Sequence, residues 1–345
     1  MTSRILAASL LAAFAVPATA QNDRVTLMNG TVHAEVRVTA FDIRSIKFTK
    51  GSANESFPTD QVAKVELAKF LDVCRRGLKD ADVMVTLARE QLKEKNLLIA
   101  QFAFVSAAAQ FFDDNKAQEA VGALEEMQTA IPEAGLLPEV YRMKFEYYIG
   151  LGSKGVNSAS TVAKKYQADA IAGAWPPGFG TEAEFFMALA DRKDPKDFQA
   201  KLKALVTKAG GGNPMIANRA NIQLANSLHE TKDVEGAKRI YEEISAKEKV
   251  DDSSRAGAYL GLGKLVMEQA SANDKDGFKK ALLLFLKVRL ETKESWPSLQ
   301  AEALYHAMLA ADKWRGPEYN LVMARCRNTL ASDFSGTEWA EKARR

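Results

Sequence analysis

The sequence predicts a mostly helical protein, an α-solenoid of about six helical hairpins preceded by a small five-stranded β module. Three observations support this fold class. Alternating apolar residues are confined to residues 23–67, helical periodicity runs from residue 79 onward, and one apolar pattern recurs at intervals of 35 to 44 residues. The 345 residues, 47% hydrophobic and 26% charged, can form a hydrophobic core and exclude a disordered or collagen-like chain.

Residues 1–20 have the features of a secretory signal peptide. Arg4 precedes an apolar run over residues 5–16, and the small residues Ala18-Thr19-Ala20 place the cleavage before Gln21. The apolar run is shorter than the roughly 20 residues that span a bilayer. We therefore expect an exported protein, periplasmic or extracellular after cleavage.

Residues 21–70 are predicted to form the β module. Valines alternate with polar residues on both sides of Asn29-Gly30, a dipeptide that favours a two-residue hairpin turn, and short apolar segments continue to Leu67. The segment from Asp23 to Val32 resembles the opening of the small Sm-like β-barrels found at the front of some exported bacterial repeat proteins. The resemblance implies a docking or oligomerising module, and the alternative is a cap that covers the first helices. Residues 71–95 are predicted to form a connecting helix.

Residues 96–345 are predicted to form the solenoid. One pattern recurs along the chain. It begins with a small or branched residue, continues with a bulky residue four positions later and, in most units, ends with an apolar residue three positions after that. Turn-forming Gly and Pro residues separate the repeats. The first residue of each pattern defines the anchors Ala120, Val162, Leu202, Ala237, Ala281 and Val322.

The repeats resemble the tetratricopeptide family. Tyr259, Leu262 and Gly263 match the first helix of that repeat, and Ala237 and Tyr241 match the second, although the spacing exceeds the family period of about 34 residues. The resemblance implies stacked hairpins whose first helices line a concave, partner-binding face.

The candidate binding residues lie on two of these first helices. Arg219, Gln223 and Asn226 are spaced i, i+4, i+7, and Lys264 occupies the corresponding position in the next repeat. Two cations and two amides could hydrogen-bond the backbone of an extended peptide or a carboxylate. The alternative is an ordinary solvated polar face.

The composition argues against several kinds of chemistry. A net charge of +3, from 47 basic and 44 acidic residues, disfavours nucleic-acid binding. The three His residues lack metal-ligand neighbours, and no catalytic motif or cofactor-binding signature is found. Cys74 and Cys326 are far apart, and Cys326 is expected to be a small buried apolar side chain. Adjacent carboxylates, which a glycosidase could use, occur at Asp113-Asp114, Glu125-Glu126, Glu242-Glu243 and Asp251-Asp252.

The sequence therefore predicts an exported, non-enzymatic scaffold without cofactor or metal, which binds a protein or peptide partner of the cell envelope on the concave solenoid face. Two alternatives remain open. One is a cell-wall glycan-binding protein or hydrolase with a helical-repeat fold, and the other is a structural envelope component that assembles through the β module.

Overall fold

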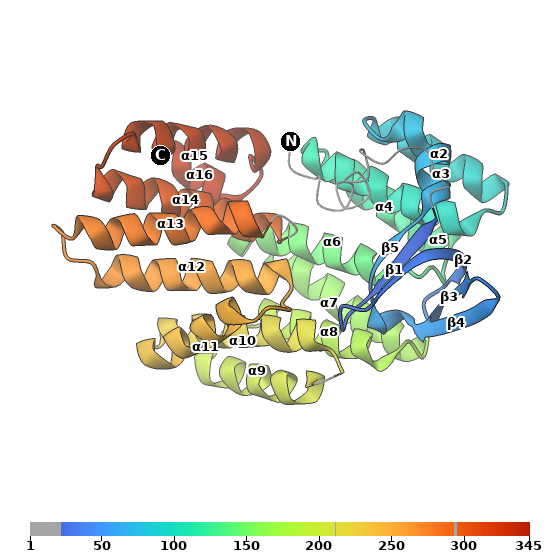
Figure 1. Ribbon diagram of the computed structural model, residues 1–345, viewed down its shortest axis with the longest axis horizontal. Coiled ribbons are helices and arrows are strands. Elements are labelled where there is room, and N and C mark those ends of the chain that lie inside the picture. Colours follow the sequence, from blue (N-terminus) through green and yellow to red (C-terminus); the bar gives the residue numbers. More distant parts are fainter. Residues whose placement is uncertain (1–21, 211, 293–294) are drawn as a thin grey trace. The chain divides into compact units, whose positions relative to one another are not determined.

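The computed structural model describes residues 22–210, 212–292 and 295–345 and confirms the fold class (Figure 1). The protein is 70% helical, and 15 helices follow a five-stranded antiparallel sheet in this part of the chain. The expected signal peptide, residues 1–20, lies outside the described residues. No helix of the described residues is long and apolar enough to cross a membrane.

The strands follow the predicted order along the chain. They are β1 (Asp23–Leu27), β2 (Val32–Phe41), β3 (Ser45–Lys50), β4 (Ala53–Pro58) and β5 (Val62–Glu66), arranged in the sheet as β4-β3-β2-β1-β5. Gly30 lies in the first turn with a positive φ of 84°, as the Asn-Gly pair suggested. The turn is longer than the predicted two residues, because Thr26 pairs with Val32 and the backbone N–H of Leu27 donates to the carbonyl of Thr31.

The sheet packs against the first helices. Gln101 is buried in α4 (Leu97–Asp113); its amide donates to the carbonyl of Phe41, and its Oε1 accepts from the backbone N–H of Leu136. The backbone N–H of Ile43 donates to the carbonyl of Glu133. These contacts correspond to the capping role that the sequence left open for the β module.

The predicted connecting helix over residues 71–95 is instead two α-helices joined by a tight turn. The helix α2 (Ala68–Cys74) begins inside the segment assigned to the β module, and α3 (Ala81–Lys93) packs against α4. The break occurs because the Asp80 side chain accepts from the N–H of Val83 and caps α3. The turn includes Gly77, where a Cβ would lie 3.0 Å from Cα of Met84.

The helices from α4 to α15 form the six predicted hairpins, pairing α4 with α5, α6 with α7, and so on to α14 with α15, and the short helix α16 follows them. Each anchor residue lies on the second helix of its hairpin, and all are buried except Val322, which is half-buried. The bounds are α5 (Ala117–Ala130), α6 (Leu137–Gly150), α7 (Val156–Ala172), α8 (Pro177–Ala190), α9 (Pro195–Ala209), α10 (Pro214–Glu230), α11 (Val234–Ala246), α12 (Asp252–Gln269), α13 (Lys275–Glu291), α14 (Pro297–Trp314), α15 (Tyr319–Asp333) and α16 (Glu338–Arg344).

Capping residues explain where many of these helices begin. An Asp or Asn immediately precedes each helix from α9 to α13, and its side-chain oxygen accepts from a backbone N–H of the first turn. In sequence order these residues are Asp194, Asn213, Asp233, Asp251 and Asp274. Five successive helices of the repeat region therefore begin with the same kind of N-terminal cap.

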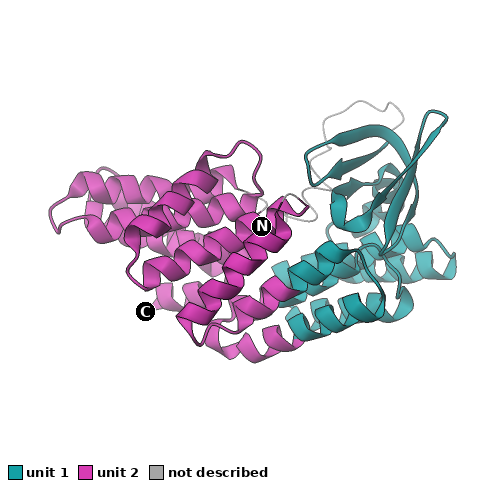
Figure 2. Ribbon diagram, turned by 90° about the horizontal axis from the view of Figure 1, so that it is seen from below, with its two compact units in different colours: residues 1–145, 162–183 teal, residues 146–161, 184–345 magenta. Residues whose placement is uncertain are grey.

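The chain divides into two compact units (Figure 2). Among the described residues, unit 1 contains the sheet and the chain to residue 145 together with residues 162–183, and unit 2 contains residues 146–161 and the chain from residue 184. In unit 2, α10, α12, α14 and α16 contact one another in succession. We call these four helices the first-helix layer, because three of them open a hairpin; α9, α11, α13 and α15 form the second-helix layer.

Glycines allow the helices of unit 2 to approach closely. Gly263, which the sequence comparison aligned with the small position of the repeat, lies in α12 against the ring of Phe285 on α13. Gly261 lies against the ring of Tyr241 on α11, and Gly257 against Ile222 on α10. The helix α12 therefore packs closely against three neighbours.

Candidate functional site

Polar side chains connect successive helices of the first-helix layer. Between α10 and α12, the Nε2 atom of His229 lies 2.8 Å from Oε2 of Glu268. Between α12 and α14, the ammonium group of Lys264 pairs with the carboxylate of Glu302. The second contact compensates the charge of Lys264 within the protein.

His306 lies one turn after Glu302 on α14 and is packed among aromatic rings. Its imidazole stacks on Phe285 with centroids 5.4 Å apart and lies 5.7 Å from the ring of Trp339, leaving 20% of the side chain exposed. Burial, followed by the nearby ammonium groups of Lys264 and Lys342, lowers the pKa of His306 to about 3. The imidazole is therefore neutral at neutral pH and offers one hydrogen-bond donor and one acceptor.

Two larger aromatic side chains complete this group. Tyr305 on α14 and Trp339 on α16 are half-buried against the C-terminal core, with ring centroids 5.4 Å apart. The ammonium group of Lys342 lies 3.8 Å from the centroid of Trp339 and also pairs with Glu338. We call Lys264, Glu302, Tyr305, His306, Trp339 and Lys342 the aromatic–ionic cluster.

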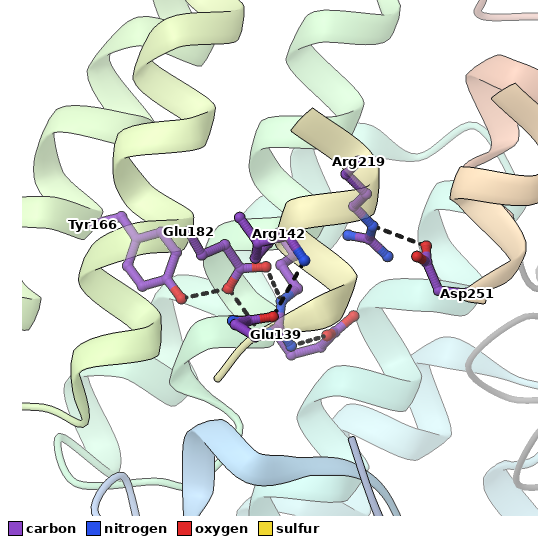
Figure 3. Close-up of polar contacts among 8 residues, drawn as sticks. Glu139, Arg142, Tyr166, Glu182, Arg219 and Asp251 are labelled. Atoms are coloured by element: carbon purple, nitrogen blue, oxygen red, sulfur yellow. Dashed lines mark hydrogen bonds and ion pairs between the residues drawn. The ribbon is translucent and has the colours of Figure 1, made fainter. Parts of the chain in front are cut away.

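Arg219 belongs to a different contact group near the start of α10. Its Nε donates to Oδ1 of Asp251 at 3.0 Å, the pair drawn in Figure 3, and its guanidinium lies 5.2 Å from the ring centroid of Trp296. The Arg219 side chain is only 13% exposed. Asp251 also caps α12 through the N–H of Ser254. The predicted cation thus holds α10 to the beginning of α12.

The other predicted residues also have partners inside the chain. Asn226 accepts from the hydroxyl of Tyr241 at 2.7 Å and donates to Oε1 of Gln223 at 3.5 Å. Lys264, as described above, is paired with Glu302. The structure joins Gln223 to Asn226 by a hydrogen bond, while Arg219 and Lys264 are engaged separately.

A second ionic network lies inside unit 1 (Figure 3). Glu182 of α8 is 1% exposed and binds Arg142 of α6 in a bidentate manner, with N–O distances of 2.8 and 2.9 Å. The hydroxyl of Tyr166 donates to the same carboxylate, and Glu139 provides Arg142 with a second anionic partner. Burial raises the pKa of Tyr166 well above its ordinary value, and the Glu182 carboxylate adds to the effect. Burial opposes the charge on Arg142, but Glu182 and Glu139 more than offset it and raise its pKa.

This network has the character of a structural element. Every charged group in it has a partner of opposite charge. The ring of Tyr166, which bonds Glu182, also stacks on Tyr141 with centroids 4.7 Å apart. Removal of one partner from a buried ion pair leaves an uncompensated charge and is strongly destabilising, as expected for contacts that hold helices together. We therefore place the candidate functional surface at the aromatic–ionic cluster.

Several of the adjacent carboxylates that the sequence offered to a glycosidase form ion pairs with neighbouring lysine or arginine side chains. Glu125 binds Lys144 at 2.9 Å, Glu126 binds Arg89 through two N–O contacts, and Glu243 pairs with Lys247. Cys74 and Cys326 are both free and buried. Within the described ranges, no group of three or more His, Cys, Asp or Glu residues is arranged to hold a metal ion.

Sequence reasoning missed most of the aromatic–ionic cluster. The i, i+4 spacing of Glu302 and His306 on one helix was a usable signal, because such residues share a face. The contribution of Trp339 had no comparable signal, since α16 lies more than 30 residues beyond Tyr305. Neither a protein-family model nor a curated protein matches this chain.

Proposed function

We propose that the protein is an exported, non-enzymatic scaffold of the cell envelope that binds a protein or peptide partner through the first-helix layer of unit 2. The observation that carries the proposal is the aromatic–ionic cluster. Tyr305 and Trp339 pack their apolar surface against the core and remain partly accessible. Partly exposed Tyr and Trp side chains supply a large share of the binding energy at protein interfaces.

The charged members of the cluster favour the peptide backbone as ligand. Lys264 and Glu302 retain exposed fractions of 30% and 17% while paired with each other. An ammonium group has three N–H donors and a carboxylate has several acceptor sites, so each keeps bonding capacity beyond the pair. Together with neutral His306, they can hydrogen-bond the C=O and N–H groups of an extended segment.

Charge compensation argues against recognition of a free carboxylate. Lys264 is neutralised by Glu302 and Lys342 by Glu338, so the cluster presents no uncompensated cation. Arg219, the other predicted cation, is neutralised by Asp251. Of the two ligand types that the sequence suggested, the extended backbone is therefore the better fit.

The glycan-binding alternative has less support at this position. A sugar ring would stack on an open aromatic face, but Lys342 already lies over one face of Trp339. We therefore do not propose peptidoglycan binding, but the experiment must distinguish it from binding to a protein or peptide.

The test uses photo-cross-linking in the native cell with a reactive residue at position 309, one turn after Tyr305, and mass spectrometry of the product. Binding of the purified partner is then titrated against the wild type and the Trp339→Ala and Tyr305→Ala variants. Loss of an interface aromatic costs about 2 kcal/mol, or about thirtyfold in Kd. The control is Leu321→Ala, which removes an exposed apolar side chain from α15.

Unchanged partner affinity in both aromatic variants would show that the cluster is not the binding surface. Peptidoglycan is tested in parallel by sedimentation and by release of soluble fragments. Binding to peptidoglycan that depends on Trp339 would favour the glycan alternative, and fragment release would contradict a non-enzymatic role.

A further inference from the structure

The outward face of α13 exposes two leucines. Leu283 and Leu290 are 53% and 70% exposed, whereas Phe278 and Phe285 on the opposite side of the helix are buried in the core. The leucines are seven residues apart, so they lie on nearly the same line of the helix and are separated by about 10 Å along its axis. They form an apolar strip that no other helix covers among the described residues.

Lysines flank this strip. At 100° per residue, Lys279 lies on one side of the Leu283–Leu290 line, and Lys280 and Lys287 lie on the other. The exposed Asp276 lies close to the same line and Glu291 at its edge, so the three lysines outnumber the two carboxylates on this face. Neither Lys279 nor Lys280 forms an ion pair with any described residue. Lys287 has a partner, since its ammonium group lies 3.7 Å from Glu291.

The charge pattern selects among possible occupants of this face. A second copy of the chain that presented the same face would bring two faces of net positive charge together, which is unfavourable. An anionic surface would complement the lysines, and a surface with an apolar layer a few ångströms deep would also receive the leucines. A bilayer that contains anionic lipids provides both.

We infer that the outward face of α13 binds the surface of a membrane that contains anionic lipids. The helix lies parallel to the bilayer, with Leu283 and Leu290 at the boundary between headgroups and acyl chains and the lysines among the lipid phosphates. This surface belongs to the second-helix layer and is distinct from the aromatic–ionic cluster. The inference is therefore independent of the proposed partner-binding function.

The experiment is flotation of the full chain, without its first 20 residues, with two kinds of vesicle. One contains phosphatidylcholine and phosphatidylglycerol in equal parts, and the other contains phosphatidylcholine alone. We expect flotation with the anionic vesicles only, and its loss at high salt because exposed charges are then screened. Absence of binding to the anionic vesicles, or equal binding to both kinds, would overturn the inference.

Two double variants test the two components of the face separately. In L283S/L290S, each lost leucine contact weakens partitioning by about tenfold. In K279E/K280E, each lost lysine contact weakens it by about fivefold, and the new negative charges weaken it further. All four positions are exposed, so both variants are expected to fold, which circular dichroism verifies.

L321S is the matched control, because Leu321 is an exposed leucine on α15, outside this face. Its flotation should equal that of the wild type, as should that of Trp339→Ala. An equal fall in L321S and L283S/L290S would refute the assignment to α13. If L283S/L290S instead lowered the molecular mass in light scattering and left flotation unchanged, the face would be a contact between copies.

Discussion

Substitution of Gly263 by alanine tests a close packing contact of the repeat. A Cβ at this position would lie 2.8 Å from Cδ1 and 2.9 Å from Cζ of Phe285, and closer still to Cε1. These distances are well below an ordinary carbon–carbon contact, and Phe285 is 1% exposed, so its ring must be displaced within a packed core. Such overpacking costs about 1–3 kcal/mol, and alanine regains about 1 kcal/mol of helix propensity. We expect a net loss of up to about 2 kcal/mol.

Gly122→Ala provides the matched control. Gly122 lies in the middle of α5, and a Cβ there would meet nothing within 4 Å. Because only the propensity effect applies, we expect this variant to be stabilised by about 0.5–1 kcal/mol. Urea unfolding followed by far-UV circular dichroism measures both changes.

A second variant within unit 2 tests whether the contact with Phe285 causes the loss of stability in Gly263→Ala. Phe285→Leu reduces the side chain that opposes Gly263, so adding it to Gly263→Ala should cost less than the sum of the two single changes. If Gly263→Ala stabilised the protein as Gly122→Ala does, α12 and α13 would not be in the close contact described, and the reasoning from the small repeat position would fail.

Two further predictions concern ionisable groups. Glu182→Gln should lower the free energy of unfolding by about 3–5 kcal/mol, because it leaves the largely buried Arg142 without its bidentate partner; a loss below about 1 kcal/mol in urea unfolding would contradict the structural role of this network. His306 has a folded-state pKa of about 3, below its unfolded value, so the unfolded state binds the additional proton as the pH falls from about 6.5 toward 3. Through this residue, stability should fall by up to about 1.4 kcal/mol per pH unit in that interval. The decrease should be smaller in His306→Phe, and an NMR titration of His306 with a midpoint above pH 6 would refute it.

The parts of the fold that could be predicted from the sequence depend on patterns among neighbouring residues. Alternation around Asn29-Gly30 and the later apolar pairs predicted the strands, since each depends on neighbouring residues only. The repeat anchors were found because each is a small or branched side chain on the second helix of a hairpin, buried in every unit except the last. The connecting helix was missed because its interruption depends on the cap at Asp80 and on the tight turn at Gly77, which a search for apolar periodicity ignores.

The candidate site was predictable only in part, because its properties depend on partners from distant helices. Helix spacing correctly placed Arg219 and Lys264 on two first helices, but it did not show that Asp251 and Glu302 neutralise them. Pairings over more than 30 residues carry no fixed sequence spacing. The same limitation hid the contact between His306 and Trp339.

The near-balanced net charge of the chain conceals two surfaces of different physical character. In the aromatic–ionic cluster, each lysine has a carboxylate partner, so binding there must rely on aromatic contact and hydrogen bonds, which salt affects little. On α13, Lys279 and Lys280 have no such partner among the described residues, so a ligand of that face gains electrostatic attraction that salt removes. Because the cluster lies on the first-helix layer and α13 on the second, the two surfaces do not overlap, and the salt dependence of binding distinguishes one from the other.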